Sequence, residues 1–278
     1  MEIKEYDFNL KDKSREEIRE WAINIPKDNV VLFRDQDLSK EDLVNIYKGI
    51  GRTYAPRKKE FFCDDEYPEL FRVTNKRVNG EKTGVFADKE LDWHSNGNAR
   101  DQGKECCIAL YCVQEGIDSV TSFCDMRQAY RDLPSTMKDE LDYIECLYGF
   151  ENGTFYDLEE DDKELEMFKN RGIYLDGIKR HLVYQHPYDN YAGLYFTFHY
   201  IREVYNNTTD WNFLYKYLLD HCFQDKYIAH HYWKPGDLIF MDQYHSLHKR
   251  NEVKGERLLY RTALDYKYAF TQDLFIQR

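Results

Sequence analysis

Apolar positions in the first fifty residues follow two different periods. From Ser14 to Ile25 they recur at helical spacing, and Ser14 is placed to cap the helix. Val30-Val31-Leu32-Phe33 is a short apolar run typical of a buried strand, and Ser39-Lys40-Glu41-Asp42 opens a second amphipathic helix that ends near Gly49. The pattern predicts a helix, a strand and a second helix.

From Phe71 onward the apolar residues fall in short runs rich in β-branched and aromatic side chains. They predict strands at Phe71 to Thr74, Cys107 to Val113, Val120 to Cys124, Tyr143 to Tyr148, Leu182 to Gln185, Leu194 to Phe198, Leu238 to Met241 and Leu258 to Tyr266. Helical spacing interrupts them at Arg127 to Arg131, Ser135 to Leu141 and Trp211 to Cys222. Short strands separated by loops favour a mostly β barrel or sandwich with flanking helices over a doubly wound parallel sheet.

Length and charge narrow the class of protein further. With 278 residues, 42% hydrophobic and 16% aromatic, the chain is long enough for one large core, so we expect a single domain over residues 1–278. The net charge of -12 argues against nucleic acid and anionic membranes as partners, because both would be repelled. We therefore expect a small-molecule ligand, and a homo-oligomer is compatible with the sequence.

Cysteine usage and the absence of long apolar runs predict a cytoplasmic protein. The seven cysteines are scattered without a CxxC pair, which suggests neither a disulfide framework nor a zinc knuckle. No segment approaches 18 consecutive apolar residues. Residues 157–166 are strongly acidic, and we interpret them as an exposed loop or as a lid within an insertion around residues 150–180.

Two histidines far apart in the sequence are candidate metal ligands. His94 lies in Leu91-Asp92-Trp93-His94-Ser95, and His245 and His248 follow the apolar run that ends at Asp242. Neutral imidazoles bind Fe(II) well, and two histidines with one carboxylate leave three coordination positions open. Spacing alone is weak evidence, since most histidines are surface or core residues.

Several segments in the right order make the chain resemble the taurine and 2,4-D dioxygenase family over roughly residues 20 to 270. The resemblance rests on the N-terminal run from Val30 to Ser39, on Trp93-His94-Ser95, on Thr121 followed by Ala129-Tyr130 and Leu133, and on Trp233-Lys234-Pro235-Gly236-Asp237-Leu238 with Asp242 six residues ahead of His248. It implies a double-stranded β-helix core of the jelly-roll, cupin-like kind. It also implies an oxygenase that uses Fe(II), 2-oxoglutarate and O₂.

The resemblance assigns roles to individual residues. His94 and His248 become the iron ligands, and His245 is expected to point along the other face of its strand or into the turn. Arg257 is expected to bind the distal carboxylate of 2-oxoglutarate with help from the Thr121 hydroxyl, because a planar guanidinium binds a carboxylate through two hydrogen bonds. Arg261 is expected to hold the C1 carboxylate of 2-oxoglutarate or an acidic group of the substrate.

Asn96 departs from the family pattern, in which an acid stands two residues after the first histidine. Asn96 can ligate iron weakly or bind a water, which leaves a hydroxylase. Alternatively, an anion such as chloride occupies the position of the missing carboxylate, which resembles the related radical halogenases. In a third interpretation the substitution is inactivating, and the protein is a barrel that binds a carboxylate ligand without turnover.

The substrate is expected between the first histidine loop and the segment Arg72 to Gly84. Hydroxylation of a small polar metabolite such as an amino acid is the preferred function. The candidate substrate contacts are Trp93, Phe86, Asn75, Asn98 and Tyr195, although core packing for the aromatic residues and loop hydrogen bonding for the two asparagines are the simpler interpretations.

Overall fold

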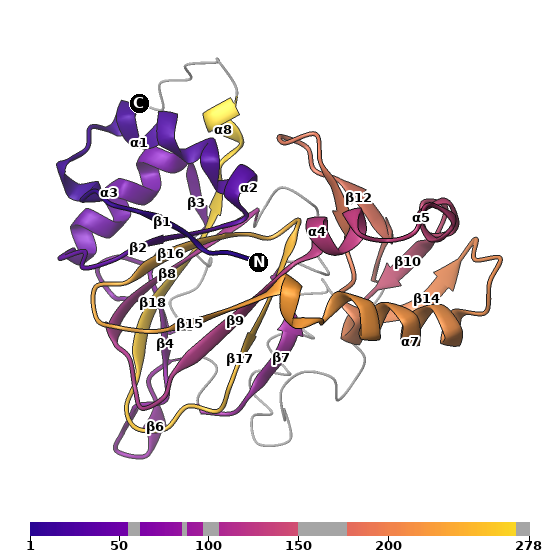
Figure 1. Ribbon diagram of the computed structural model, residues 1–278. Helices are drawn as coiled ribbons and strands as arrows, with labels where there is room; N and C mark the ends of the chain where they lie inside the picture. Colours follow the sequence, from indigo (N-terminus) through magenta and orange to yellow (C-terminus); the bar gives the residue numbers. More distant parts are fainter. Residues whose placement is uncertain (55–61, 85–87, 97–105, 150–176, 271–278) are drawn as a thin grey trace.

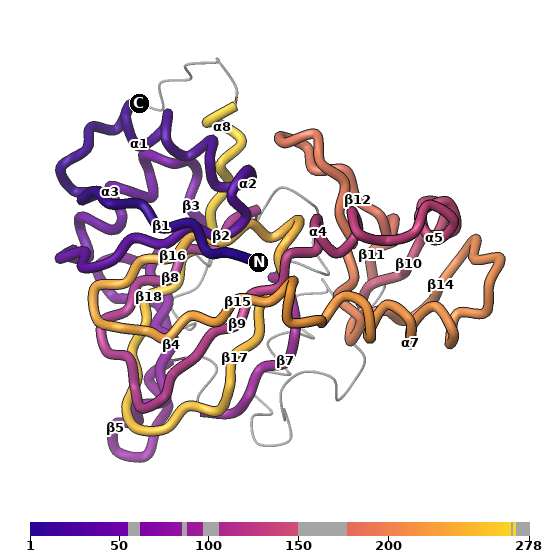
Figure 2. Tube along the Cα trace, viewed as in Figure 1, coloured from indigo at the N-terminus to yellow at the C-terminus, as the bar shows by residue number. Residues whose placement is uncertain are grey.

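Two β-sheets form the body of the protein in the computed structural model, which describes residues 1–54, 62–84, 88–96, 106–149 and 177–270 (Figure 1). The larger sheet has the order β1 (Lys4–Tyr6), β2 (Val30–Phe33), β16 (Leu238–Asp242), β8 (Cys107–Gln114), β18 (Leu258–Asp265) and β3 (Arg52–Tyr54), and β4 (Phe71–Thr74) also pairs with β18. The smaller sheet has the order β15 (Ile228–Tyr232), β9 (Val120–Asp125), β17 (Ser246–Arg250) and β7 (Leu91–His94). Figure 2 shows β9 and β17 side by side, although they are far apart in the sequence.

Alternating side chains give the larger sheet two apolar faces. On β8, Ile108, Leu110 and Cys112 belong to one buried cluster, together with Phe123 of β9. This inner cluster therefore lies between the two sheets. The residues that alternate with them along β8 point to the other face of the sheet and belong to a second cluster there: Cys107, Ala109 and Tyr111.

The N-terminal helices supply that second cluster. They are α1 (Arg15–Ala22), α2 (Asn24–Asp28) and α3 (Lys40–Ile50). Ser14 and Ser39 each form a capping box. The predicted role of Ser14 as a helix cap is thereby confirmed. The predicted helix from Ser14 to Ile25 is wrong at its end, because it breaks at Ile23 into α1 and α2. Pro26 explains the break. Proline has no N–H, so within a continuous helix from Arg15 it could not donate the hydrogen bond to the preceding turn, whereas it is tolerated in the first turn of a new helix.

A lobe beside the two sheets contains most of the remaining elements (Figure 1). It consists of α4 (Met126–Arg131), α5 (Ser135–Leu141), α7 (Trp211–Cys222), the sheet of β10 (Glu145–Tyr148), β11 (Ile178–His181) and β14 (Ile201–Tyr205), and the pair β12 (Val183–Gln185) and β13 (Ala192–Leu194). Trp93 of β7 and Leu247 of β17 join its buried cluster, so the lobe packs on the outer face of the smaller sheet. The other elements are β5 (Arg77–Val78), β6 (Glu81–Lys82), α8 (Lys267–Phe270) and the 3-10 turns η1 (Leu10–Asp12), η3 (Phe198–Tyr200) and η4 (Asp225–Tyr227).

The mostly β architecture confirms the predicted class, with differences in detail. The expected strand at Leu194 to Phe198 is wrong: β13 ends at Leu194, and the buried residues that follow lead into a 3-10 turn. The strands that were not predicted are β1, β3, β5, β6, β7, β11, β14, β15 and β17. The acidic residues 157–166 lie outside the described residues. In the part of the chain that is described, none of the helices has the length and apolarity needed to cross a membrane.

Candidate active site

The structure brings His94 and His248 together as direct neighbours on adjacent strands. They are paired in the register of β7 with β17, and their ring centroids lie 4.1 Å apart. His248 also stands opposite Phe123 of β9, which belongs to the cluster between the sheets. Residues paired across strands share a face, so both imidazoles face the space between the sheets.

The chemistry of these two rings fits a metal ligand. The Nδ1 atom of His94 lies 2.7 Å from the backbone oxygen of Asp92. A carbonyl only accepts, so Nδ1 carries the proton and Nε2 keeps its lone pair. Burial lowers the pKa of His94 to about 4, and burial, with the neighbouring His94 ring and the charge of Arg261, keeps the pKa of His248 well below its usual range. Both rings are therefore neutral at pH 7, as metal coordination requires.

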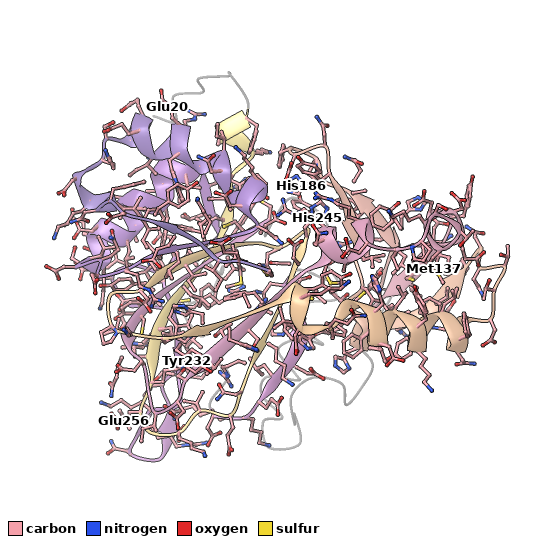
Figure 3. The ribbon with its side chains drawn as sticks, in the orientation of Figure 1. Glu20, Met137, His186, Tyr232, His245 and Glu256 are labelled. Carbon is pink, nitrogen blue, oxygen red and sulfur yellow. The ribbon has the colours of Figure 1, made fainter. Side chains whose placement is uncertain are left out.

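His245 is directed elsewhere, as the resemblance predicts. It lies in the turn between β16 and β17 and is 1% exposed. Its ring contacts the ring of His186 at 5.1 Å between centroids, and its Nε2 lies 3.3 Å from the backbone carbonyl oxygen of Tyr184. Figure 3 shows His186 and His245 next to each other at the junction of the sheets and the lobe.

The Asp242 carboxylate organises the turn that leads to His248. One oxygen accepts hydrogen bonds from the backbone N–H groups of Tyr244 and His245 at 2.9 and 2.7 Å. The other accepts a hydrogen bond from the Tyr266 hydroxyl and lies 3.2 Å from Nε2 of His186. Although burial acts to raise it, the pKa of Asp242 is lowered by the neighbouring His186 and His245 and by the hydrogen bond from Tyr266. An ionised carboxylate with these partners fixes the start of β17.

Arg257 is held in a rigid frame just before β18. The Asn75 side chain accepts from its backbone N–H at 3.0 Å and donates to the Gly255 oxygen at 2.7 Å, while the Thr74 hydroxyl donates to the Arg257 carbonyl. The guanidinium is buried, and Nη1 lies 3.4 Å from the Ser119 hydroxyl. Among the described residues, Nε has no hydrogen-bond partner, and burial lowers the pKa of Arg257 to about 9. A buried cation with an unused donor fits an anionic ligand.

Thr121 lies on β9 within the same space. Its Oγ1 accepts a hydrogen bond of 2.8 Å from the Trp233 indole, which leaves the hydroxyl proton to donate. Its neighbour across the strands is Arg250 of β17. Arg250 was not predicted as a site residue, although its position two residues after His248 places it on the same face of a strand.

Arg261 is half-buried on β18. Its guanidinium lies over the Phe71 ring, 5.6 Å from the centroid. Its cross-strand partner Leu110 belongs to the cluster between the sheets, so Arg261 faces the same space as the imidazole pair, and its charge contributes to lowering the pKa of both His94 and His248. This location is compatible with either of the two expected roles of Arg261.

Asn96 is tied to the same turn as His248 through its backbone. Its N–H donates to the Gln243 side chain at 2.7 Å. In the described ranges, no cluster of three or more histidine, cysteine, aspartate or glutamate side chains is placed to hold a metal ion. A carboxylate that replaces the missing acid is therefore not found there, and ligation by the Asn96 amide stays a prediction.

The expected substrate contacts are dispersed. Trp93 stacks on Phe223 at 5.3 Å within the lobe cluster, and the Tyr195 hydroxyl accepts a hydrogen bond of 2.8 Å from Arg180 in the same cluster. Asn75 holds the backbone of Arg257. Phe86 and Asn98 lie outside the described residues.

The fold and the paired imidazoles define the class: a two-sheet β protein whose sheets enclose a candidate metal site beside a buried arginine. The family model "Taurine catabolism dioxygenase TauD, TfdA family" matches residues 2–263. The chain belongs to this family of 2-oxoglutarate-dependent dioxygenases.

Individual relatives agree with this assignment. The chain is 25% identical over 261 residues to the alpha-ketoglutarate-dependent 2,4-dichlorophenoxyacetate dioxygenase of Burkholderia sp. (strain RASC), covering 88% of this chain and 84% of the relative. The enzyme of the same name from Cupriavidus pinatubonensis is also 25% identical, covering 90% and 89%. Among solved structures, a putative taurine dioxygenase from Burkholderia xenovorans has a TM-score of 0.72 at 18% identity, covering 95% of this chain and 86% of that one. AAD-2 in complex with Mn(II) and N-oxalylglycine has a TM-score of 0.69 at 21% identity, covering 93% and 91%.

Proposed function

We propose that this protein is an Fe(II)- and 2-oxoglutarate-dependent oxygenase that hydroxylates an unactivated C–H bond of a small polar metabolite such as an amino acid. The main support is the neutral pair His94 and His248 beside the buried guanidinium of Arg257. The two facing sheets also support a double-stranded β-helix core. The capture of Mn(II) and N-oxalylglycine by AAD-2 shows that a protein of this fold accommodates a metal with a carboxylate ligand.

Each group of the chain has a defined task in this proposal. His94 and His248 hold the metal, and the hydrogen bond to Asp92 fixes the orientation of the His94 ring. Arg257 and Thr121 bind the distal carboxylate, which directs the keto-acid end of the cosubstrate toward the imidazoles. Bound iron supplies activation of O₂ coupled to decarboxylation of 2-oxoglutarate. The burial of these residues excludes bulk water from the reacting groups.

An anaerobic titration tests this function. Fe(II) and then 2-oxoglutarate are added while the weak visible band of a chelated keto acid is recorded. We expect the band in the natural protein, its loss in His94→Ala and His248→Ala, and its retention in the control His245→Ala. Absence of the band in correctly folded natural protein would favour a barrel that binds its ligand without turnover.

Radical halogenation is a second candidate, and the missing acid is the observation that favours it. Fe(II) with two neutral histidines and dianionic 2-oxoglutarate is formally neutral, so chloride supplies the charge that a carboxylate normally provides. Asn96 is bulkier than the glycine or alanine of the halogenases, which ranks this candidate below hydroxylation. Mass spectrometry of products over a range of chloride concentrations tests it, with Asn96→Gly as the variant expected to raise halide incorporation. Products that do not change with chloride in either protein would exclude it.

A further inference from the structure

Arg250 is a buried arginine of the candidate site that has not been given a role. It ends β17, two residues after His248, and only 4% of it is exposed. A buried guanidinium is costly unless it serves an interaction, because its charge is removed from water.

The strand register places Arg250 beside Thr121, two residues along β17 from the candidate metal ligand His248. On β9, the partner of His248 is Phe123 and the partner of Arg250 is Thr121. Phe123 belongs to the cluster between the sheets, so Arg250 also faces that space. Its Nη2 donates to the backbone oxygen of Lys89, which anchors the end of the side chain.

Electrostatics agree with this placement. The charge of Arg250 lowers the pKa of Arg257, after the larger effect of burial. Burial dominates at His94 as well, where the backbone hydrogen bond of Asp92 opposes it and Arg250 is the first of the charges that lower the pKa. The charge of Arg250 thus acts on His94 and on Arg257.

A carboxylate has more acceptor capacity than one guanidinium uses. Its two oxygens have about four lone-pair sites, and a two-point contact with Arg257 occupies two of them. The Thr121 hydroxyl can fill a third. Arg250, as the cross-strand neighbour of Thr121, is placed to supply the next donor and a second positive charge.

We propose that Arg250 is a second arginine for the distal carboxylate of the keto-acid cosubstrate, beside Arg257 and Thr121, so that the site selects keto diacids over keto monoacids. This inference rests on the proposed function. It predicts that Arg250 affects the binding of the distal carboxylate and leaves chelation by the keto-acid end unchanged.

Binding measured with two keto acids tests this role without a turnover assay. The dissociation constants of 2-oxoglutarate and pyruvate are determined anaerobically from the visible band of the Fe(II)-loaded protein. Pyruvate has the chelating keto-acid end but lacks a distal carboxylate. Arg250→Gln is expected to weaken 2-oxoglutarate binding about thirtyfold, as for loss of a buried charged partner, and to leave pyruvate binding unchanged. Arg250→Lys should give an intermediate loss, because it keeps the charge without the planar fork.

Lys249→Gln is the matched control. Lys249 neighbours Arg250 but points to the opposite side of β17, where it pairs with Glu90 at 2.7 Å. The Lys249→Gln protein should bind both keto acids with the same dissociation constants as the natural protein. Unchanged 2-oxoglutarate binding in Arg250→Gln would overturn the inference, as would an equal loss for both keto acids, which indicates a structural role. Failure of the natural protein to bind either keto acid would instead refute the proposed function.

Discussion

Replacing Arg257 with methionine separates the energetic cost of its charge from its use in binding. Burial lowers the pKa of this guanidinium to about 9. A lowering of this size means that the charged form costs the folded protein on the order of 5 kcal/mol without a ligand. Methionine keeps much of the apolar stem and, among the described residues, gives up the long contact of Nη1 with the Ser119 hydroxyl at 3.4 Å. We expect Arg257→Met to raise the free energy of unfolding by about 1–3 kcal/mol, since lost packing offsets part of the gain.

The same substitution should abolish the stabilisation that 2-oxoglutarate gives to the natural protein. Urea denaturation with and without 2-oxoglutarate, in the presence of Fe(II) and absence of O₂, measures both effects. Arg257→Lys is the control, because it retains a buried cation and should not gain stability. The reasoning is refuted if Arg257→Met is less stable than the natural protein without ligand, or if 2-oxoglutarate still stabilises it to the same extent.

Three further substitutions test the surroundings of the site. Asn75→Ala removes the frame of Arg257 and should weaken 2-oxoglutarate binding about fivefold in the visible-band titration, with Fe(II) affinity unchanged; loss of both would point to general unfolding. Gly193→Ala places a Cβ 2.7 Å from Cδ2 of His245 and should lower the free energy of unfolding by about 1–3 kcal/mol in urea. A free energy of unfolding equal to that of the natural protein would show that the His245 ring can move aside. Asn96→Asp restores the acid and should tighten Fe(II) binding about tenfold in competition with a chelator; unchanged affinity would mean that residue 96 does not reach the metal.

Local features of the sequence predicted the elements with an apolar face. The capped helix that starts after Ser14 and the apolar strands of the larger sheet follow from spacing that a few neighbouring residues define. The pair His94 and His248 came from the order of several segments along the chain. Their placement 4.1 Å apart is the arrangement that the metal hypothesis requires.

The two strands that carry the paired histidines, and β15 of the same sheet, could not be predicted in this way. β7, β15 and β17 have polar or histidine-containing sequences, because part of their buried surface faces polar groups instead of an apolar core. Hydrophobic periodicity does not detect such strands, since it records only apolar burial. Arg250 was overlooked for the same reason.

The family, the capped helices and the residue types of the site follow from the order of residues along the chain. Three arrangements follow only from the packed fold: Arg250 stands opposite Thr121, Asn75 holds Arg257, and Trp93 packs in the lobe. The physical reason is that periodicity is a property of adjacent residues. Strand register instead joins positions more than a hundred residues apart, and it is selected by the packing of the whole core.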